Sequence, residues 1–273
     1  MISSGAPGEP PPKAVDLPIE LIIDDYDVEA FGEVAASFDG ERLGYVVTPN
    51  VDHIIRYHDD SRFRSIYSDA AYVLLDSRFL ARCLAVLRGQ KLRVCPGSDL
   101  TAYLLSRASK PTDRIVLVGA SGEQARRLVA QYNLDNLVHI DPPMGFIRNP
   151  EEVERCLRLI EEASPFRYCF LAVGSPQQEL IAWQLQQRQR ARGLMLCIGG
   201  SINFLTGIER RAPKWIQQLG GEWMFRLLQS PTRMATRYLV RGPRFFLLLR
   251  RLRIVASSPA KLRRGADVGV RST

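Results

Sequence analysis

Polar and glycine-rich segments follow most of the short apolar runs in this sequence, and their residue types suit the binding of a phosphorylated ligand. Asp76 directly follows an apolar run, and Gly119, Gly174 and Gly199 each follow another. In open α/β sheets, ligands bind beyond the carboxyl ends of the strands. Glycine, hydroxyl, amide or carboxylate groups occupy five such positions, at 48–50, 76–78, 119–122, 174–176 and 199–201. A ligand-binding cleft along one edge of a sheet is therefore the leading hypothesis.

Asp76 allows two interpretations. It can cap the helix that follows it, as aspartate often does, or it can act as a general base toward a substrate hydroxyl at the mouth of the sheet. Gln178 and Glu179 leave a similar choice between helix capping and hydrogen bonds to a sugar or phosphate. Pro176 suits the first turn of the helix that carries them. The sequence alone leaves both choices open.

Several classes of protein and site are disfavoured by the composition. Segment 119–122 lacks the G-x-G-x-x-G spacing of a dinucleotide site, which argues against a dinucleotide-dependent oxidoreductase. Five cysteines without a C-x-x-C motif and three scattered histidines predict neither a disulfide framework nor a metal centre, so we expect a reducing cytoplasm. Segment 1–16 reads as a flexible, proline-rich tail without a secretory signal pattern. The apolar run 245–249 is far shorter than the roughly 20 residues of a membrane span.

Alternating apolar and mixed segments predict an α/β fold. Continuous apolar runs of strand length are typical of a parallel sheet that helices cover on both faces. We therefore expect one mostly parallel sheet between helices in a core over residues 17–221, with a candidate edge strand at 17–23. The expected strands are 43–47, 72–75, 115–118, 137–140, 168–173 and 194–198, and the expected helices are 51–68, 78–88, 99–109, 121–132, 150–163 and 177–192.

The last part of the chain is strongly basic. The whole chain has a net charge of +8, yet residues 210–264 carry 14 lysines and arginines and a single acid, Glu222. A solvated basic face, nucleic acid, an anionic membrane surface and a phosphate-bearing ligand all suit this pattern. Apolar residues at 245, 248, 249, 252 and 255 predict an amphipathic helix that either packs on the core or lies on an anionic bilayer. We expect residues 222–273 to form a basic, helical appendage.

A set of spaced motifs extends over about 46–249. It comprises Thr48-x-Asn50, Asp76, Arg93-x-x-x-Gly97, Gly174-x-Pro176-x-Gln178-Glu179, Gly200, Arg211-Ala212-Pro213 and Glu222-Trp223-x-x-Arg226. In composition and order this set resembles the WecG/TagA/CpsF glycosyltransferases, which form glycosyltransferase family 26. The resemblance implies a Rossmann-like hexosyltransferase that inverts the anomeric configuration and needs neither a metal ion nor a cofactor.

The resemblance also implies the substrates and the setting. The donor would be a UDP-sugar of the UDP-glucose, UDP-N-acetylmannosamine or UDP-N-acetylmannosaminuronic acid type. The acceptor would be a saccharide linked to polyprenyl diphosphate, in the synthesis of exopolysaccharide or a cell-wall polymer. The enzyme would lie in the cytoplasm, peripherally on the inner face of the bacterial plasma membrane, where it meets anionic lipid. A homo-oligomer is compatible with the resemblance, and nucleic acid is not an expected partner.

Individual residues take roles from the same resemblance. Asp76 matches the general base. Two positions depart from the family pattern, because Ser77 stands where the family usually has glycine and Asn203 where it often has aspartate. The expected substrate-binding residues are Thr48, Asn50, Arg93, Gly97, Gly174, Pro176, Gln178, Glu179, Gly200 and Asn203.

Arginine side chains are the expected ligands of the donor diphosphate. The resemblance implies no metal ion, so positive charge for the diphosphate must come from side chains, and arginine stays charged and binds phosphate in a bidentate manner. The expected ligands are Arg226, Arg233 and Arg237 in the appendage. Two rival hypotheses remain, a basic nucleic-acid-binding α/β protein and an inactive membrane-bound scaffold, and tests of UDP binding and turnover separate them from the enzyme.

Overall fold

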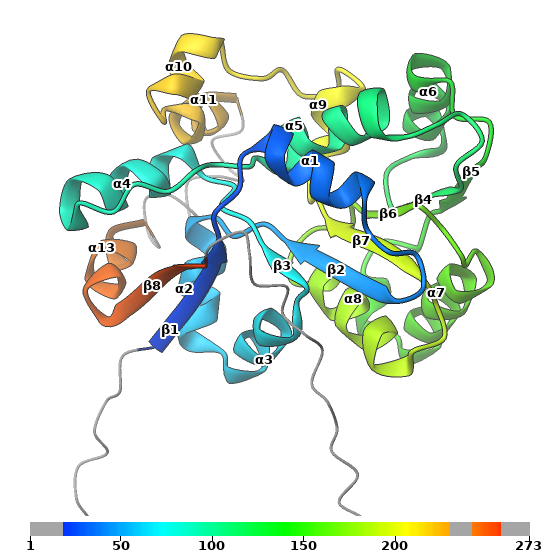
Figure 1. Cartoon of the computed structure of the whole chain (residues 1–273), viewed down its shortest axis with the longest axis horizontal. Coiled ribbons are helices and arrows are strands. Elements are labelled where there is room, and N and C mark those ends of the chain that lie inside the picture. The colour runs from blue at the N-terminus through cyan, green and yellow to red at the C-terminus, as the bar shows by residue number, and fades with distance from the viewer. Residues whose placement is uncertain (1–18, 230–241, 258–273) are drawn as a thin grey trace, which may run out of the picture.

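A six-stranded, all-parallel sheet forms the centre of the molecule (Figure 1). The computed structural model describes residues 19–229 and 242–257, so the predicted tail at 1–16 and the predicted ligands Arg233 and Arg237 lie outside the described residues. The parallel arrangement confirms the predicted α/β, Rossmann-like fold class. Across the sheet the strands are β3 (Tyr72–Val73), β2 (Leu43–Val47), β7 (Gly193–Cys197), β6 (Tyr168–Leu171), β4 (Ile115–Val118) and β5 (Leu137–Ile140).

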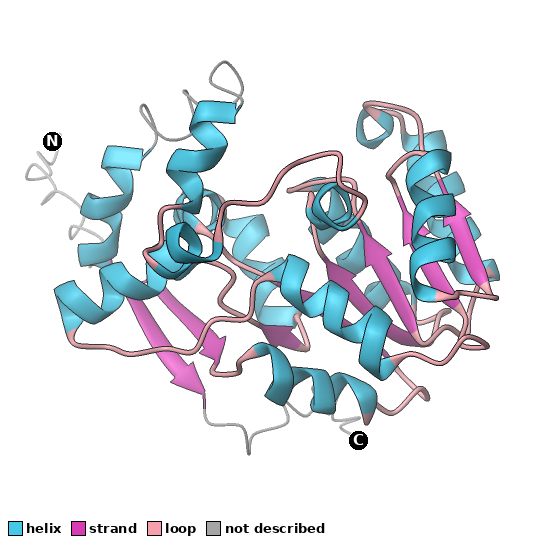
Figure 2. Cartoon of the chain, turned by 90° about the horizontal axis from the view of Figure 1, so that it is seen from above, coloured by secondary structure: helices cyan, strands magenta, loops and turns pink. Residues whose placement is uncertain are grey.

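Helices cover both faces of this sheet (Figure 2). Neighbouring residues of one strand point to opposite faces, and accordingly Tyr45 and Val47 belong to one buried cluster while Val46 belongs to the other. Helices α2 (Val51–Asp59), α3 (Ser61–Asp69), α4 (Arg78–Arg88), α7 (Pro150–Glu162) and α8 (Gln177–Arg188) supply the first cluster. The second cluster receives α1 (Val28–Ala36), α5 (Gly97–Tyr103) with its π-helical extension Leu104–Ala108, α6 (Gly122–Tyr132) and α9 (Ser201–Leu205). A short 3-10 helix, Phe146–Arg148, precedes α7.

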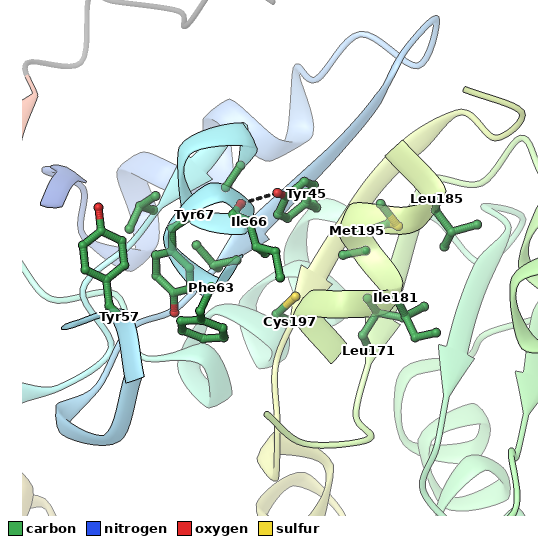
Figure 3. Packing of buried hydrophobic residues seen from close by; sticks show 14 of the residues in the cluster. Tyr45, Tyr57, Phe63, Ile66, Tyr67, Leu171, Ile181, Leu185, Met195 and Cys197 are labelled. Atoms are coloured by element: carbon green, nitrogen blue, oxygen red, sulfur yellow. Dashed lines mark hydrogen bonds between the residues drawn. The ribbon is translucent and has the colours of Figure 1, made fainter. Parts of the chain in front are cut away.

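Figure 3 shows side chains of the first cluster packed between the sheet and the helices that cover it. The Tyr45 hydroxyl donates a hydrogen bond to the Ile66 carbonyl, which links β2 to α3. The predicted helix 51–68 is in fact two helices. It breaks at Asp60, whose side chain accepts hydrogen bonds from the backbone of Arg62 and Phe63 and thereby caps α3.

A second, two-stranded parallel sheet joins β1 (Ile19–Asp24) to β8 (Leu252–Ser257), as the adjacent blue and red strands of Figure 1 show. The candidate strand at 17–23 thus exists, but it pairs with β8 and not with the edge of the main sheet. Buried Asp24 connects the two sheets. Its Oδ2 accepts a hydrogen bond from the Val73 amide at 2.8 Å, and its Oδ1 accepts one from the Ser257 hydroxyl.

The predicted amphipathic helix over 245–255 is wrong in its second half. Helix α13 spans Gly242–Arg251, and the chain then enters β8 because β1 offers a free strand edge. Phe245, Leu248 and Leu249 are buried in the first cluster, so this apolar arc packs on the core. Two short helices, α10 (Lys214–Gln218) and α11 (Glu222–Gln229), precede it. Within the described ranges, no helix combines the length and apolar character that crossing a membrane requires.

Candidate active site

Side chains from three strand exits converge around Asp76. Asp76 follows β3, and its Oδ1 accepts a hydrogen bond of 2.7 Å from the amide of Gly97, the first residue of α5. A Cβ atom built on Gly97 would lie 3.6 Å from Thr48 Oγ1, 3.7 Å from Asp76 Oδ1 and 3.5 Å from Ser201 Oγ. Thr48 follows β2 and Ser201 follows β7, which are adjacent strands. Glycine at position 97 therefore keeps a small space open between one carboxylate and two hydroxyl groups.

The helix after Asp76 is capped by Ser77. Its hydroxyl accepts a hydrogen bond from the Leu80 amide at 3.2 Å and so caps α4. The capping interpretation of Asp76 therefore does not apply to α4, and the carboxylate faces α5 through Gly97. Serine in place of the usual glycine at 77 thus has a local structural function.

Hydroxyl groups of the same cluster are oriented by backbone carbonyls. Thr48 Oγ1 donates to the Cys197 carbonyl at 3.0 Å, and Ser201 Oγ donates to the Ile198 carbonyl at 2.6 Å. Both side chains are buried. Ser201 was absent from the residues expected to bind substrate. Its only sequence signal was a hydroxyl group directly after the pair Gly199-Gly200.

Asn50 begins α2 and makes a reciprocal cap with His53. The Asn50 side chain accepts hydrogen bonds from the amides of Asp52 (3.0 Å) and His53 (3.5 Å). In return, His53 Nδ1 accepts the Asn50 amide at 3.1 Å. The imidazole Nε2 lies 3.4 Å from Glu179 Oε1. Sequence reasoning missed His53, because a single histidine on a helix has no distinctive spacing.

Gln178 and Glu179, at the start of α8, are both buried. Gln178 Nε2 donates to Glu179 Oε1 at 2.8 Å, and Gln178 Oε1 accepts the Gly199 amide at 2.8 Å. Burial acts to raise the pKa of Glu179, but the neighbouring His53 and the hydrogen bond from Gln178 outweigh it, so its pKa lies below the usual value. Glu179 is consequently a buried carboxylate held in its ionised form.

The glycines predicted to bind substrate border the same exits. Gly174 has φ +80° and nothing within 4 Å of a Cβ built on it, so the backbone is open to the surroundings there. Pro176 precedes α8. Gly200 is exposed beside Asn203. The Asn203 amide is engaged on both sides, since its oxygen accepts Gln124 Nε2 at 2.9 Å and its nitrogen donates to Glu209 at 3.2 Å.

Arg93 makes different contacts from those expected. Its backbone amide donates to Asp25 Oδ1 at 2.7 Å, and its guanidinium pairs with Asp25 (3.4 Å) and Asp27 (3.9 Å). These acids belong to the segment between β1 and α1. Arg93 therefore links that segment to the loop that precedes α5. Its side chain is exposed.

An ion-pair network joins α4, which follows Asp76 in the chain, to α5 and α11. Arg78 and Arg211 both bind Asp99. The Nη2 atom of each arginine donates a hydrogen bond of 3.0 Å to Asp99 Oδ2. Glu222 of α11 completes the network at 3.6 Å from Arg78 and 3.5 Å from Arg211. Burial acts to raise the pKa of Asp99, but its bonds to Arg211 and then Arg78 prevail and lower that pKa. The side chain of Arg226 lies outside what the structure describes.

These observations fit the comparison with known families. A model of the family described as glycosyl transferase WecG/TagA/CpsF matches residues 17–258. The chain belongs to this family. Its reaction class is therefore the transfer of a glycosyl group. Within residues 19–229 and 242–257, this glycosyltransferase has no group of three or more side chains that could hold a metal ion.

Proposed function

We propose that this glycosyltransferase moves a sugar from a UDP-sugar to a saccharide linked to polyprenyl diphosphate, with inversion and without a metal ion. The observation that carries the proposal is the Asp76 carboxylate, held by the Gly97 amide beside Thr48 and Ser201 where three strands end. A fixed carboxylate at the mouth of a parallel sheet suits the removal of a proton from an acceptor hydroxyl.

The proposed step needs no reagent other than the donor, the acceptor and Asp76. The acceptor oxygen forms a bond to the anomeric carbon as the bond from that carbon to the UDP oxygen breaks. The hydroxyl proton passes to Asp76, and the electron pair of the broken bond leaves on the diphosphate. Because Gly97 holds Oδ1, the second carboxylate oxygen is the natural proton acceptor. Arg226, Arg233 and Arg237 remain the proposed ligands of the leaving diphosphate, because arginine binds phosphate in a bidentate manner.

The substitution Asp76→Asn tests this proposal. The asparagine oxygen can still accept the Gly97 amide, so the fold and UDP affinity are expected to persist. Loss of the base should reduce turnover by roughly 100-fold or more. Asp113→Asn is a matched control, because the Asp113 side chain accepts the Lys110 amide in a turn before β4, at the other end of the strands. Near-native turnover by Asp76→Asn would refute the assignment.

We further propose peripheral attachment to an anionic membrane through the appendage. The buried arc of α13 cannot serve this purpose, but its neighbours Phe246 and Leu247 are exposed. Phe79 of α4 contacts both Trp223 of α11 and Phe246 of α13, so these two helices flank one ring. Further exposed apolar side chains on α10 and α11, or directly after α10, are Trp215, Leu219, Met224 and Leu228. Exposed apolar groups beside cations favour binding to anionic lipid.

A further inference from the structure

One continuous chain of hydrogen bonds and charge contacts runs behind three strand exits. It begins at the Asn50 amide after β2, passes through His53, Glu179 and Gln178, and ends at the Gly199 amide after β7. His53 is 7% exposed and Glu179 is 1% exposed, so neither side chain is placed to meet a ligand directly. The chain instead connects the backbone segments that a ligand would meet.

The contacts of His53 define its tautomer. The Asn50 amide is a donor, so Nδ1 must be the acceptor and the ring proton must lie on Nε2. Nε2 lies 3.4 Å from Glu179 Oε1. With this tautomer His53 accepts from the β2 exit and places its N–H beside the buried carboxylate, and no other tautomer can do both.

Glu179 in turn sets the orientation of the Gln178 amide. An amide has one donor end and one acceptor end, and a flip would exchange them. Because Glu179 Oε1 requires the donor end, Gln178 must present its oxygen to the Gly199 amide, at 2.8 Å. Gly199 has φ +53°, a left-handed conformation that favours glycine. Without Glu179, the Gln178 amide loses one of the two partners that fix its direction, the other being the Gly199 amide itself.

An apolar side chain would fill the Glu179 site at a lower desolvation cost than an ionised carboxylate. The presence of an ionised carboxylate at this site is therefore best explained by the groups that it positions. We infer that His53 and Glu179 are positioning residues that hold the Gly199-Gly200 turn in its donor-binding geometry through Gln178. This inference rests on the proposed function, in which the turn contacts the UDP-sugar. It also replaces direct substrate contact as the role of Glu179.

Two variants of Glu179 provide the central test. Glu179→Gln keeps an oxygen that can accept from Gln178 and lie beside His53, so donor KM and the Kd of UDP should stay within about 3-fold of wild type. Glu179→Leu removes the hydrogen bond from Gln178 and the contact with His53, so we expect donor KM and UDP Kd to rise at least about 10-fold, as for loss of a buried hydrogen bond. The kcat should change less than about 3-fold, because the Asp76 cluster is separate from this chain. A purely structural defect would instead lower apparent kcat at unchanged KM.

Hydrogen exchange at the Gly199 amide gives a readout independent of activity. Exchange there should accelerate by at least about 10-fold in Glu179→Leu and stay near wild type in Glu179→Gln. His53→Leu is the second route to the same effect if Glu179→Leu does not fold. His58→Gln is the matched control, because His58 lies on the same helix but contacts Asp59.

The outcomes separate the two proposals. If wild-type protein binds no UDP while Glu179→Leu still accelerates exchange at Gly199, the proposed function fails and the positioning chain stands as a structural feature only. Unchanged donor KM, UDP Kd and Gly199 exchange in folded Glu179→Leu or His53→Leu would overturn the inference. It would equally be overturned if neither leucine variant folds, since the residues would then serve stability.

Discussion

Two adjacent phenylalanines of α13 should separate a contribution to stability from a contribution to membrane binding. Phe245 is 0% exposed and packs against Phe79, with ring centroids 6.3 Å apart. Phe246 is 48% exposed. The substitutions Phe245→Ala and Phe246→Ala remove the same atoms from neighbouring positions, so each is the matched control of the other.

The expected magnitudes follow from burial. Truncating a fully buried phenylalanine costs about 3–5 kcal/mol, and in a protein of this size each kcal/mol lowers Tm by roughly 2–4 °C. Phe245→Ala should therefore lower Tm by roughly 6–20 °C. Phe246→Ala should cost about 1 kcal/mol or less, because half of its surface is already in water. Transfer of that exposed half into a bilayer would contribute roughly 1 kcal/mol, or about a 5-fold change in partition.

Thermal unfolding and sedimentation with anionic liposomes measure the two quantities. At a temperature where both variants are folded, Phe246→Ala should bind liposomes about 5-fold more weakly than wild type, and Phe245→Ala should bind like wild type. Added salt should weaken binding by all three proteins, because cations contribute to it. If wild-type protein stays in the supernatant at low salt, the membrane role is refuted. A Tm change of Phe245→Ala no larger than that of Phe246→Ala would refute the assignment of the arc to the core.

Three further predictions concern stability, pH and metal ions. Asp24→Ala leaves the buried Val73 amide without its acceptor and should lower the free energy of unfolding by about 1–3 kcal/mol in urea titrations; an unchanged midpoint would contradict the role of Asp24. The pKa of Asp99 is lower in the folded than in the unfolded protein, so its stabilising effect is complete above its unfolded pKa of about 4 and is lost as the pH falls through the folded value. Stability of Asp99→Asn should accordingly depend less on pH below about pH 4, and identical pH profiles of the two proteins would count against the network. EDTA should leave turnover unchanged, whereas strict dependence on Mg²⁺ or Mn²⁺ would disprove the metal-independent mechanism.

The main sheet was predictable because its central strands β2, β4, β6 and β7 are buried on both faces. Continuous apolar runs gave the bounds of β2, β4 and β5 as the structure has them. The junction of α13 and β8 was not predictable in this way. Residues 245, 248, 249 and 252 keep helical spacing up to the first residue of β8, and the partner strand β1 lies far away in the sequence. Local periodicity carries no information about a strand edge that only the tertiary fold provides.

The candidate site was partly predictable for a related reason. Asp76, Thr48 and Gly97 follow apolar runs or motifs, and the structure brings them together. His53 was missed because its importance arises only from its proximity to Glu179 across the fold. The residue that caps α4 could not be identified from sequence, because Asp76 and Ser77 are both good caps and only the observed bond from the Leu80 amide to Ser77 decides.

The pairing of β1 with β8 also constrains the order of folding. Asp24 and Ser257, which are hydrogen-bonded at its end, lie 233 positions apart in the chain. During synthesis, β1 leaves the ribosome long before its partner exists, and such long-range contacts form slowly because a large loop must close. Until β8 has emerged, β1 exposes an unpaired strand edge that can associate with other chains. The nascent enzyme should therefore depend on chaperones most strongly in the interval between the completion of β7 and the arrival of β8.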